Sequence, residues 1–296
     1  METDNRDLMR VIQSKFSRLS KGQKMIADFI LKHYDKAAFM TAARLGQSVG
    51  VSESTVVRFA IELDYEGYPE LQKSLQELVK TKLTAVQRLE LTTDLVSDNN
   101  SLKNVLKADM ENIRSTMEKV NQRTFDDFVA EIDNAKKVYI IGLRSSSALS
   151  EFLGFYLNLI MRNVVVLSHG MSDIYEQMIH LGPEDVIIGI GYPRYSIKTV
   201  EYLRFARSRG TRVLCLTDSL LSPLAAESDL TLIAQSNMAS FVDSLVAPMS
   251  MINAIIVAMG LKRRGAVAET FSKLEEIWTE NEVFATRNPE NYENNE

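Results

Sequence analysis

Apolar residues follow two different spacings along this chain, and the change between them divides it into two parts. In residues 1–90 they recur three and four positions apart, as in the run Met25, Ile26, Phe29 and Ile30, which predicts helices. After residue 136, short continuous apolar runs rich in β-branched residues alternate with helical segments. Runs of this kind are typical of strands buried on both faces of a parallel sheet.

Five such runs are predicted to be the strands of one sheet. They are Val138–Ile141, Val164–Leu167, Val186–Ile190, Val213–Leu216 and Leu230–Ile233. The stretches between them are long enough to hold crossover helices, which predicts a doubly wound sheet with helices on both faces. The fold class is therefore α plus α/β: an all-helical N-terminal domain followed by a three-layer α/β/α domain with a five-stranded parallel sheet.

Polar segments set the expected domain boundaries. We expect a helical domain at 1–90, a helical linker at 91–123, an α/β domain at 124–285 and a polar tail at 286–296. A helix from Pro69 is expected to run toward Leu89. Another begins at Ser101 and carries six apolar residues on one face: Leu102, Val105, Leu106, Met110, Ile113 and Met117.

Charge and cysteine content narrow the class of protein. Residues 1–90 hold 14 Lys and Arg against 12 Asp and Glu, whereas the remainder holds 20 against 27. This weak asymmetry permits DNA contact in the first part without demonstrating it. Cys215 is the only cysteine, which excludes a disulfide within the chain and a cysteine metal cluster. We expect neither a metal nor a cofactor.

The longest apolar stretch, residues 245–261, is interrupted by Pro248, Ser250 and Asn253. It predicts a buried helix rather than a membrane span. The first ten residues are acidic and lack the apolar centre of a secretory signal. These observations predict a cytoplasmic protein with no membrane partner.

The segment from Thr41 to Leu63 predicts two short helices joined by a tight turn. Gly50 stands where such a turn needs a positive φ angle, and the small Gly46 stands where the two helices come closest. Ser52 is placed to cap the second helix. This spacing is typical of a DNA-binding helix-turn-helix, although a three-helix bundle with no nucleic-acid role has a similar pattern.

The residues predicted to contact DNA lie at the exposed starts of these two helices. They are Thr41, Arg44, Ser52, Glu53, Ser54, Thr55 and Arg58. Short hydroxyl side chains can approach bases and phosphates closely, and Arg58 can reach a guanine edge or a phosphate. Glu53 fits equally well as a solvated acid that stabilises the helix dipole.

Polar side chains also follow the first and third predicted strands, in the segments 142–147 and 191–196. Ligands of parallel sheets bind at the carboxyl ends of the strands, and hydroxyls at a helix start favour an anion. The residues predicted to bind this anion are Arg144, Ser145, Ser146, Ser147, Ser168, Arg194 and Ser196. Arg144 and Arg194 are expected to face the same anion, because their strands should be neighbours. Ordinary capping is the alternative role for the serines.

The run Gly-Val-Ser-Glu-Ser-Thr-Val-Val-Arg-Phe at 50–59, followed by Tyr-Glu-Gly-Tyr-Pro-Glu-Leu-Gln at 65–72, resembles the N-terminal domain of the RpiR (MurR/RpiR) regulators. Members of that family join this domain to a SIS, or sugar isomerase, domain. The resemblance covers almost the whole chain, because the α/β half follows in the same order and at the same size. It implies a DNA-binding transcriptional regulator that senses a phosphorylated sugar or a related anionic metabolite.

The resemblance also assigns roles in the two loops. SIS domains usually carry Gly-x-Gly-x-Ser in the first loop, so Ser146 corresponds to the phosphate-binding serine and Arg144 replaces the second glycine. The second loop is usually of the type Ser-x-Ser-Gly-x-Thr. There the two serines are replaced by glycine and proline, Arg194 replaces the glycine, and only Ser196 keeps the hydroxyl. Two lost hydroxyls and two gained guanidinium groups favour an anion held more by charge.

The expected partners are a double-stranded DNA operator, a phosphorylated carbohydrate or similar anionic effector, and a second copy of the chain. One helix-turn-helix reads few base pairs, so a homodimer or higher homo-oligomer is expected. Two alternatives remain: a sugar-phosphate isomerase-type enzyme of the SIS fold, and an α/β half used only as a dimerisation scaffold. Isomerisation needs an acid and a base, and the three histidines form no recognisable pair with a carboxylate. No catalytic residue is predicted.

Overall fold

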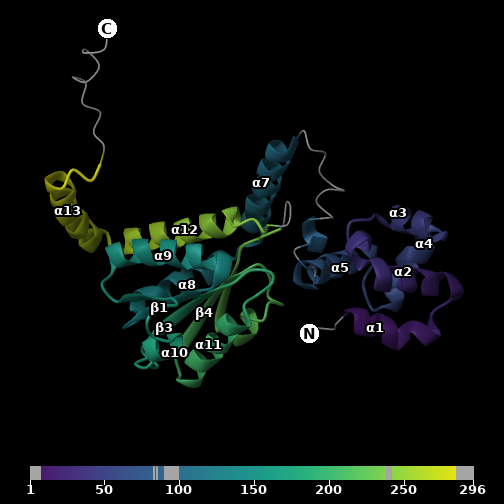
Figure 1. The fold of residues 1–296 in the computed structure, drawn as a ribbon, viewed down its shortest axis with the longest axis horizontal. Helices are drawn as coiled ribbons and strands as arrows, with labels where there is room; N and C mark the ends of the chain where they lie inside the picture. The colour runs from purple at the N-terminus through teal and green to yellow at the C-terminus, as the bar shows by residue number, and fades with distance from the viewer. Residues whose placement is uncertain (1–7, 83, 85, 90–99, 238–241, 285–296) are drawn as a thin grey trace, which may run out of the picture.

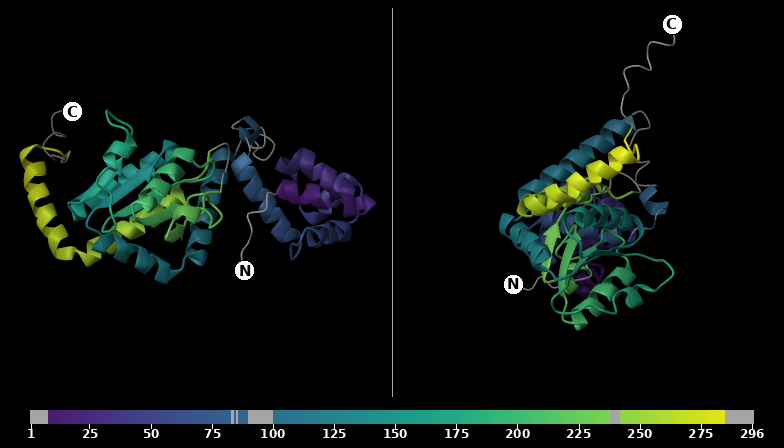
Figure 2. Two further views of the ribbon diagram at one scale, coloured as in Figure 1. Left: turned by 90° about the horizontal axis from the view of Figure 1, so that it is seen from below. Right: turned by 90° about the vertical axis from the view of Figure 1, so that its left-hand side faces the viewer.

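A computed structural model describes residues 8–82, 84, 86–89, 100–237 and 242–284. It contains a helical region near the N-terminus and an α/β region that follows it, drawn at opposite ends of the molecule in Figure 1 and in the left view of Figure 2. The described helices of the first region are α1 (Leu8–Lys15), the short 3₁₀ helix η1 (Phe16–Arg18), α2 (Lys21–Ala37), α3 (Ala42–Val49), α4 (Glu53–Glu62) and α5 (Tyr68–Lys82).

The helical region is built around α2 and α5. Ser20 and Gln23 form the capping box that starts α2, because the Ser20 hydroxyl accepts from the Gln23 N–H and the Gln23 side chain accepts from the Ser20 N–H. The apolar faces of the five α-helices meet in one core. Its fully buried members include Ile12, Ile26, Ile30, Leu45, Val56, Phe59, Leu71 and Leu75.

Side chains of α5 hold the turn between α2 and α3. The Tyr68 hydroxyl donates to the Met40 carbonyl at 2.7 Å, and the Gln72 amide donates to the same oxygen at 2.8 Å. One turn later Gln76 donates to the Ala38 carbonyl at 3.2 Å. Burial raises the pKa of Tyr68 to about 12, so the phenol stays a hydrogen-bond donor at neutral pH. The position of α3 is therefore fixed by α5.

The helix predicted from Pro69 to Leu89 is wrong in its second half. The structure ends α5 at Lys82, and residues 86–89 form a separate short helical segment. Thr84 and Gln87 explain this second start: the Thr84 hydroxyl accepts from the Gln87 N–H at 3.3 Å, and the Gln87 amide oxygen accepts from the Thr84 N–H at 3.0 Å. This reciprocal cap begins a new helix at a point where the apolar periodicity of the sequence shows no break.

The five predicted strands are confirmed. They are β1 (Val138–Gly142), β2 (Val164–Leu167), β3 (Val186–Ile190), β4 (Arg212–Thr217) and β5 (Leu230–Ile233). All neighbouring pairs are parallel, in the order β2-β1-β3-β4-β5. The order of strands reverses between β1 and β3, which makes their carboxyl ends the expected binding crevice.

Helices cover both faces of this sheet, as the sequence predicts (Figure 1). The described helices of this region are α7 (Ser101–Lys119), α8 (Gln122–Asn134), the 3₁₀ helix η3 (Arg144–Ser146), α9 (Ser147–Ile160), α10 (Ile174–Gln177), α11 (Ile197–Ser208), the 3₁₀ helix η4 (Ala225–Glu227), α12 (Val246–Lys262) and α13 (Arg264–Glu280). One core lies between the sheet and α8, α9 and α12, and a second lies between the sheet and α10 and α11.

The apolar stretch at 245–261 forms the helix α12, which buries Met251, Ile252 and Ile255 against α9 and the sheet. None of the described helices is by itself long and apolar enough to cross a membrane. Only α12 and α13 together reach the required length and hydropathy, and they meet at a bend of 100°.

Candidate functional site

The helix-turn-helix geometry of α3 and α4 agrees with the predicted roles of its glycines. Gly50 ends α3 with a φ of 75°, and its N–H donates to the carbonyls of Gln47 and Gly46. A Cβ atom on Gly46 would lie 2.8 Å from the Val51 carbonyl oxygen, so only glycine fits there. Thr41 caps α3, since its hydroxyl accepts from the Arg44 N–H at 3.2 Å.

Ser52 occupies the cap position of α4 but does not make the predicted side-chain cap. Its hydroxyl lies 2.9 Å from the hydroxyls of both Ser54 and Thr55. These neighbours offer hydroxyl partners at the exposed helix start, where they replace the backbone N–H as partner of Ser52. The result is a cluster of three linked hydroxyls at the first turn of α4.

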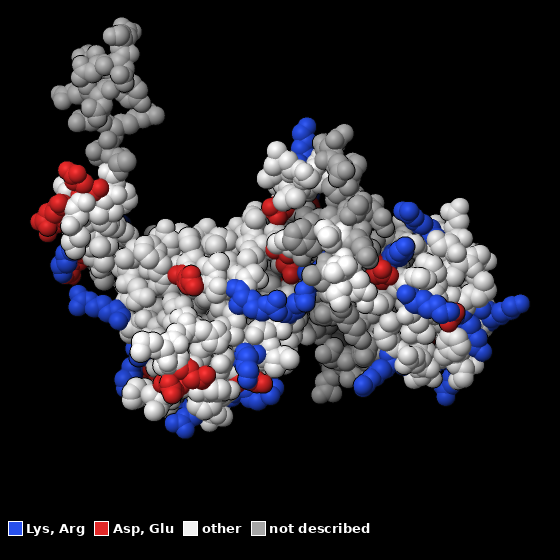
Figure 3. Space-filling model, viewed as in Figure 1, with Lys and Arg blue, Asp and Glu red and all other residues white. Residues whose placement is uncertain are grey.

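The seven residues predicted to contact DNA lie on the accessible side of α3 and α4. Thr55 is half-buried and the other six are exposed. Arg58 lies one turn after Ser54, and its Nε donates to the Ser54 carbonyl at 3.2 Å. On the face drawn in Figure 3, Lys and Arg side chains are spread over this region with few Asp and Glu side chains among them, whereas Asp and Glu side chains are more frequent on the α/β region, α13 included. The arrangement can present hydroxyls and the guanidinium groups of Arg44 and Arg58 to a DNA groove.

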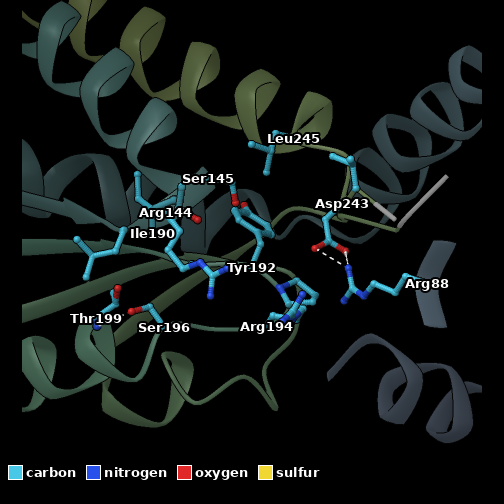
Figure 4. A pocket seen from close by; sticks show the side chains of 15 residues that line it. Arg88, Arg144, Ser145, Ile190, Tyr192, Arg194, Ser196, Thr199, Asp243 and Leu245 are labelled. Carbon is cyan, nitrogen blue, oxygen red and sulfur yellow. Dashed lines mark hydrogen bonds and ion pairs between the residues drawn. The ribbon is translucent and has the colours of Figure 1, made fainter. Parts of the chain in front are cut away.

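The second site is a cavity of about 220 Å³ at the carboxyl ends of β1 and β3 (Figure 4). The two strands pair with Gly142 opposite Ile190, so the loops that follow them leave the sheet side by side. The residues that line the cavity are Arg88, Leu143, Arg144, Ser145, Ser146, Ile190, Gly191, Tyr192, Pro193, Arg194, Ser196, Thr199, Val242, Asp243 and Leu245. The expectation that Arg144 and Arg194 lie on neighbouring strand ends is confirmed.

Both of these arginines adopt a backbone conformation that favours glycine. The φ angle is 59° at Arg144 and 62° at Arg194, in the left-handed region. Non-glycine residues in this region cost about 1–3 kcal/mol each, and such residues cluster at functional sites. The loops therefore keep a glycine-type path while placing two long cationic side chains along the cavity wall.

Two serines lie at helix starts beside these arginines. Ser146 is buried at the start of α9, and Ser196 caps α11 by accepting from the Thr199 N–H at 3.4 Å. The first N–H groups of a helix carry partial positive charge and attract anions. The loop after β3 is held in place by Tyr195, whose hydroxyl donates to an Asp218 carboxylate oxygen at 2.6 Å. Together these groups form a cationic cavity with hydroxyl donors.

Ser147 and Ser168 do not line this cavity. The Ser168 carbonyl accepts from the Gln177 side chain at 2.7 Å, which holds the loop after β2 to α10. The strand order explains this placement, because β2 lies on the far side of β1 from β3. The crevice opens between β1 and β3, so the loop after β2 leads away from it.

Four lining residues with polar side chains were not among the predicted set: Arg88, Tyr192, Thr199 and Asp243. Tyr192 belongs to the second loop and is buried, and among the described residues its hydroxyl has no hydrogen-bond partner. Burial raises the pKa of Tyr192 well above its ordinary value, so its hydroxyl stays protonated. The loop motif could have indicated Tyr192 and Thr199. Nothing in the local sequence indicates that Arg88 and Asp243 would reach the same cavity.

Among the described residues, no group of three or more His, Cys, Asp or Glu side chains is arranged to hold a metal ion. Cys215 lies buried in β4, and burial raises the pKa of its thiol. That thiol is therefore neutral and sits in the core rather than in the cavity.

Two family profiles match the chain. The profile of the helix-turn-helix domain of the rpiR family matches residues 6–82, and the profile of the SIS domain matches residues 131–258. The chain is 24% identical over 284 residues to the HTH-type transcriptional regulator HexR of Escherichia coli, covering 93% of this chain and 95% of that one. It is 26% identical over 231 residues to an uncharacterised HTH-type transcriptional regulator of Haemophilus influenzae, covering 77% and 79%.

Solved structures show the same folds. The sugar isomerase domain of an RpiR transcription factor from Sphaerobacter thermophilus aligns with a TM-score of 0.56 at 27% identity, covering 58% of this chain and 96% of that one. The NanR protein of Vibrio vulnificus, solved in complex with ManNAc-6P, aligns with a TM-score of 0.55 at 18% identity, covering 95% and 100%. The second likeness extends over both regions of the chain.

Proposed function

Because this chain belongs to the rpiR family of helix-turn-helix transcriptional regulators and carries a SIS domain, we propose that the SIS cavity senses a phosphorylated sugar or a related anionic metabolite and thereby controls operator binding. The helix-turn-helix supplies the DNA contact and the strand-end cavity supplies the effector site. The proposal places the protein in the cytoplasm, where chromosomal DNA and phosphorylated metabolites occur together.

One observation carries the proposal for the effector. Arg144 and Arg194 stand at neighbouring strand ends, both in a strained backbone conformation, and both line one cavity with Ser146 and Ser196. Guanidinium groups bind phosphate oxygens through paired charge-assisted hydrogen bonds. The NanR structure, which has the same fold and was solved with a sugar phosphate, supports a ligand of this class.

For the DNA half, we propose that the start of α4 enters the major groove. Ser52, Ser54 and Thr55 would approach bases and phosphates, and Arg58 would contact a guanine edge or a phosphate. Thr41 and Arg44, at the start of α3, would contact the backbone. Selection from a pool of random double-stranded DNA tests this assignment. The full chain should enrich a two-fold symmetric site, and a pool without enrichment would contradict it.

We propose a homodimer or higher homo-oligomer, because a single helix-turn-helix reads too few base pairs for specificity. The helix α7 supports this, since its six predicted apolar residues form a helix face that stays exposed in the single chain; Leu102 is 72% exposed and Met117 is 69% exposed. Exposed contiguous apolar faces are typical of interfaces. Sedimentation of the full chain at micromolar concentration should give a dimer or larger species, and a monomer would contradict this part.

We propose binding without turnover. No histidine is among the described residues that line the cavity, and Asp243, the only acidic one among them, pairs with Arg88 at 2.9 Å. One carboxylate alone does not supply both the acid and the base that isomerisation needs. Isomerisation assays with hexose and pentose phosphates should show no product above background. Turnover of any of them would contradict the proposal that the cavity only binds its ligand.

The central experiment is calorimetry of the full chain with a panel of sugar phosphates, sugar acids and inorganic phosphate. Arg194→Ala should weaken binding of the anions that the native chain binds, whereas Arg209→Ala, at an exposed position at the end of α11 outside the cavity, should not. If no anion in the panel bound the native chain, the sensor proposal would fail and the scaffold alternative would replace it.

A further inference from the structure

The cavity contains an arginine from outside the SIS domain. Arg88 lies in the short helical segment 86–89 that follows α5, and its side chain is only 1% exposed. Its Nη1 donates to both carboxylate oxygens of Asp243, at 2.9 and 3.0 Å. Figure 4 shows the Arg88 side chain reaching Asp243 from a separate helical segment. This ion pair joins positions 155 residues apart and ties the end of the helical region to the SIS domain.

The charges in the cavity are unbalanced. Arg88, Arg144 and Arg194 are cationic, and Asp243 is the only acidic side chain among the described lining residues. Removing a cation from water is costly unless a counter-ion is close, so Asp243 stabilises the buried Arg88. An anionic ligand would be a second counter-ion for the same guanidinium group. Arg88 therefore has two possible partners in one cavity.

The segment that carries Asp243 also contacts α7. The next residue, Ser244, donates to the Asp109 carboxylate at 2.6 Å, and Asn112 exchanges two hydrogen bonds with the backbone of Asn237, at 3.1 Å each. These contacts anchor the segment to the helix whose apolar face we propose as an interface. A change in the partner of Arg88 would thus act where the helical region, the cavity and α7 meet.

We propose that Arg88 is an effector-binding residue, and that the anionic group of the effector replaces Asp243 as its partner. This rests on the proposed function, because it needs an anion in the SIS cavity. Effector binding then breaks the ion pair that fixes the helical region to the SIS domain. A ligand can change an arrangement only by binding one state more tightly than another, and here the two states differ in the partner of Arg88.

The proposal makes a prediction about affinity that a purely structural ion pair does not. If Asp243 and the anion compete for Arg88, weakening Asp243 must strengthen anion binding, by reciprocity of the coupling. Arg88→Gln removes one guanidinium from the anion and should weaken binding about tenfold or more, as expected for a charge-assisted contact. Asp243→Asn removes the competing charge and should tighten binding about fivefold.

The experiment uses inorganic phosphate, the group shared by all phosphorylated metabolites, titrated into the full chain by calorimetry. The variants are Arg88→Gln, Asp243→Asn and the double variant, with Arg209→Gln as the control. Thermal denaturation is measured for each variant, so that a folding defect is seen directly. The double variant leaves no buried charge unpaired and should bind phosphate as weakly as Arg88→Gln.

Each outcome decides a separate point. If Arg194→Ala loses phosphate binding while Arg88→Gln keeps it, this inference is wrong and the proposed function stands. Weaker binding by Asp243→Asn would show that Asp243 positions Arg88 for the ligand, which overturns the competition. If the native chain binds phosphate and no arginine variant changes it, both proposals are wrong about the site. If the native chain bound neither phosphate nor any sugar phosphate, both the proposed function and this inference would be wrong.

A second measurement does not depend on affinity. Small-angle X-ray scattering of the native chain should give a larger radius of gyration when phosphate saturates the site, because the ion pair between the regions is broken. The Asp243→Asn variant should show that larger value without phosphate. Equal radii in all three samples would contradict the release of the helical region.

Discussion

A residue with positive φ occurs both in the turn between α3 and α4 and in the loops after β1 and β3, but the residue type differs. Gly50 takes a φ of 75° in the first, and Arg144 and Arg194 take φ angles of 59° and 62° in the second. Glycine adopts this conformation without steric cost, whereas arginine adopts it at a cost of about 1–3 kcal/mol. The helix-turn-helix thus has glycine at its position of positive φ, whereas the two cavity loops have arginine at theirs.

The difference separates a glycine that serves the fold from two arginines that we propose serve binding. Gly50 is exposed, and its role is to turn the chain so that α4 meets α3. Arg144 and Arg194 line the cavity, where a glycine would fold more easily but would supply no charge. Strain that persists at a lining residue is evidence that the side chain is needed there.

The largest effect is expected at the recognition helix. Arg58→Ala should weaken binding of the selected operator by about ten- to hundredfold, because a base or phosphate contact of arginine contributes about 1–3 kcal/mol. Electrophoretic mobility shift with the selected DNA measures this, and phosphate binding should not change. Arg123→Ala, at an exposed position on α8, is the matched loss of charge and should leave operator affinity as it is. Equal losses in both variants would show a non-specific charge effect.

The next effect tests the two strained arginines directly. Arg194→Gly should weaken phosphate binding about tenfold and raise the free energy of unfolding by about 1 kcal/mol, because glycine relieves the strain. Arg194→Ala should weaken binding equally without the gain in stability, since alanine is strained at the same φ. Calorimetry and thermal denaturation separate the two quantities. A glycine variant no more stable than the alanine variant would refute the strain argument.

Gly50→Ala makes the reverse change in the other turn. It should lower the free energy of unfolding by about 1 kcal/mol, because alanine is strained at a φ of 75°. No heavy atom lies within 4 Å of the added Cβ, so the loss measures backbone strain alone. Chemical denaturation gives the value. An unchanged stability would show that this turn does not need glycine.

The smallest expected effect is on the stability of the protein at acidic pH. The carboxylates with lowered pKa values among the described residues, Asp133, Glu184 and Glu269, all lie in the α/β region. Hydrogen bonds from Arg263 and then Lys262 lower the pKa of Asp133, so its stabilisation is present above the ordinary value of 3.8 and is lost as the pH falls through the lowered one. Asp133→Asn should reduce this loss by less than about 1 kcal/mol. Stability curves between pH 5 and pH 2 that coincide for both proteins would contradict it.

The sheet was predictable because burial on both faces leaves continuous apolar runs, as in Val186–Ile190. The cavity was predictable as far as Arg144, Ser145, Ser146, Arg194 and Ser196, because strand ends and helix starts can be found in the sequence. The side of the sheet on which each loop lies depends on strand order, which no local pattern encodes, and Ser168 was therefore grouped with a cavity that it does not line.

The two residues that reach the cavity from farthest away were not predictable at all. In the sequence, Arg88 is one more polar position in a helical pattern that continues from Pro69. Only the structure shows that a separate helical segment begins at Thr84. Asp243 lies 155 residues further along the chain. Their contact depends on how the two regions pack, and periodicity carries no information on packing between regions.

The helix α5 has a mechanical consequence. It is 15 residues long, and three of its side chains hold the turn before α3, while the segment that follows its other end carries Arg88. At 1.5 Å per residue it is a rod of about 22 Å, so a tilt of about 10° at one end displaces the other by about 4 Å. That displacement exceeds the spacing of about 3.4 Å between base pairs. A tilt too small to alter any contact within α5 would move α4, which we propose as the recognition helix, out of register with a DNA groove.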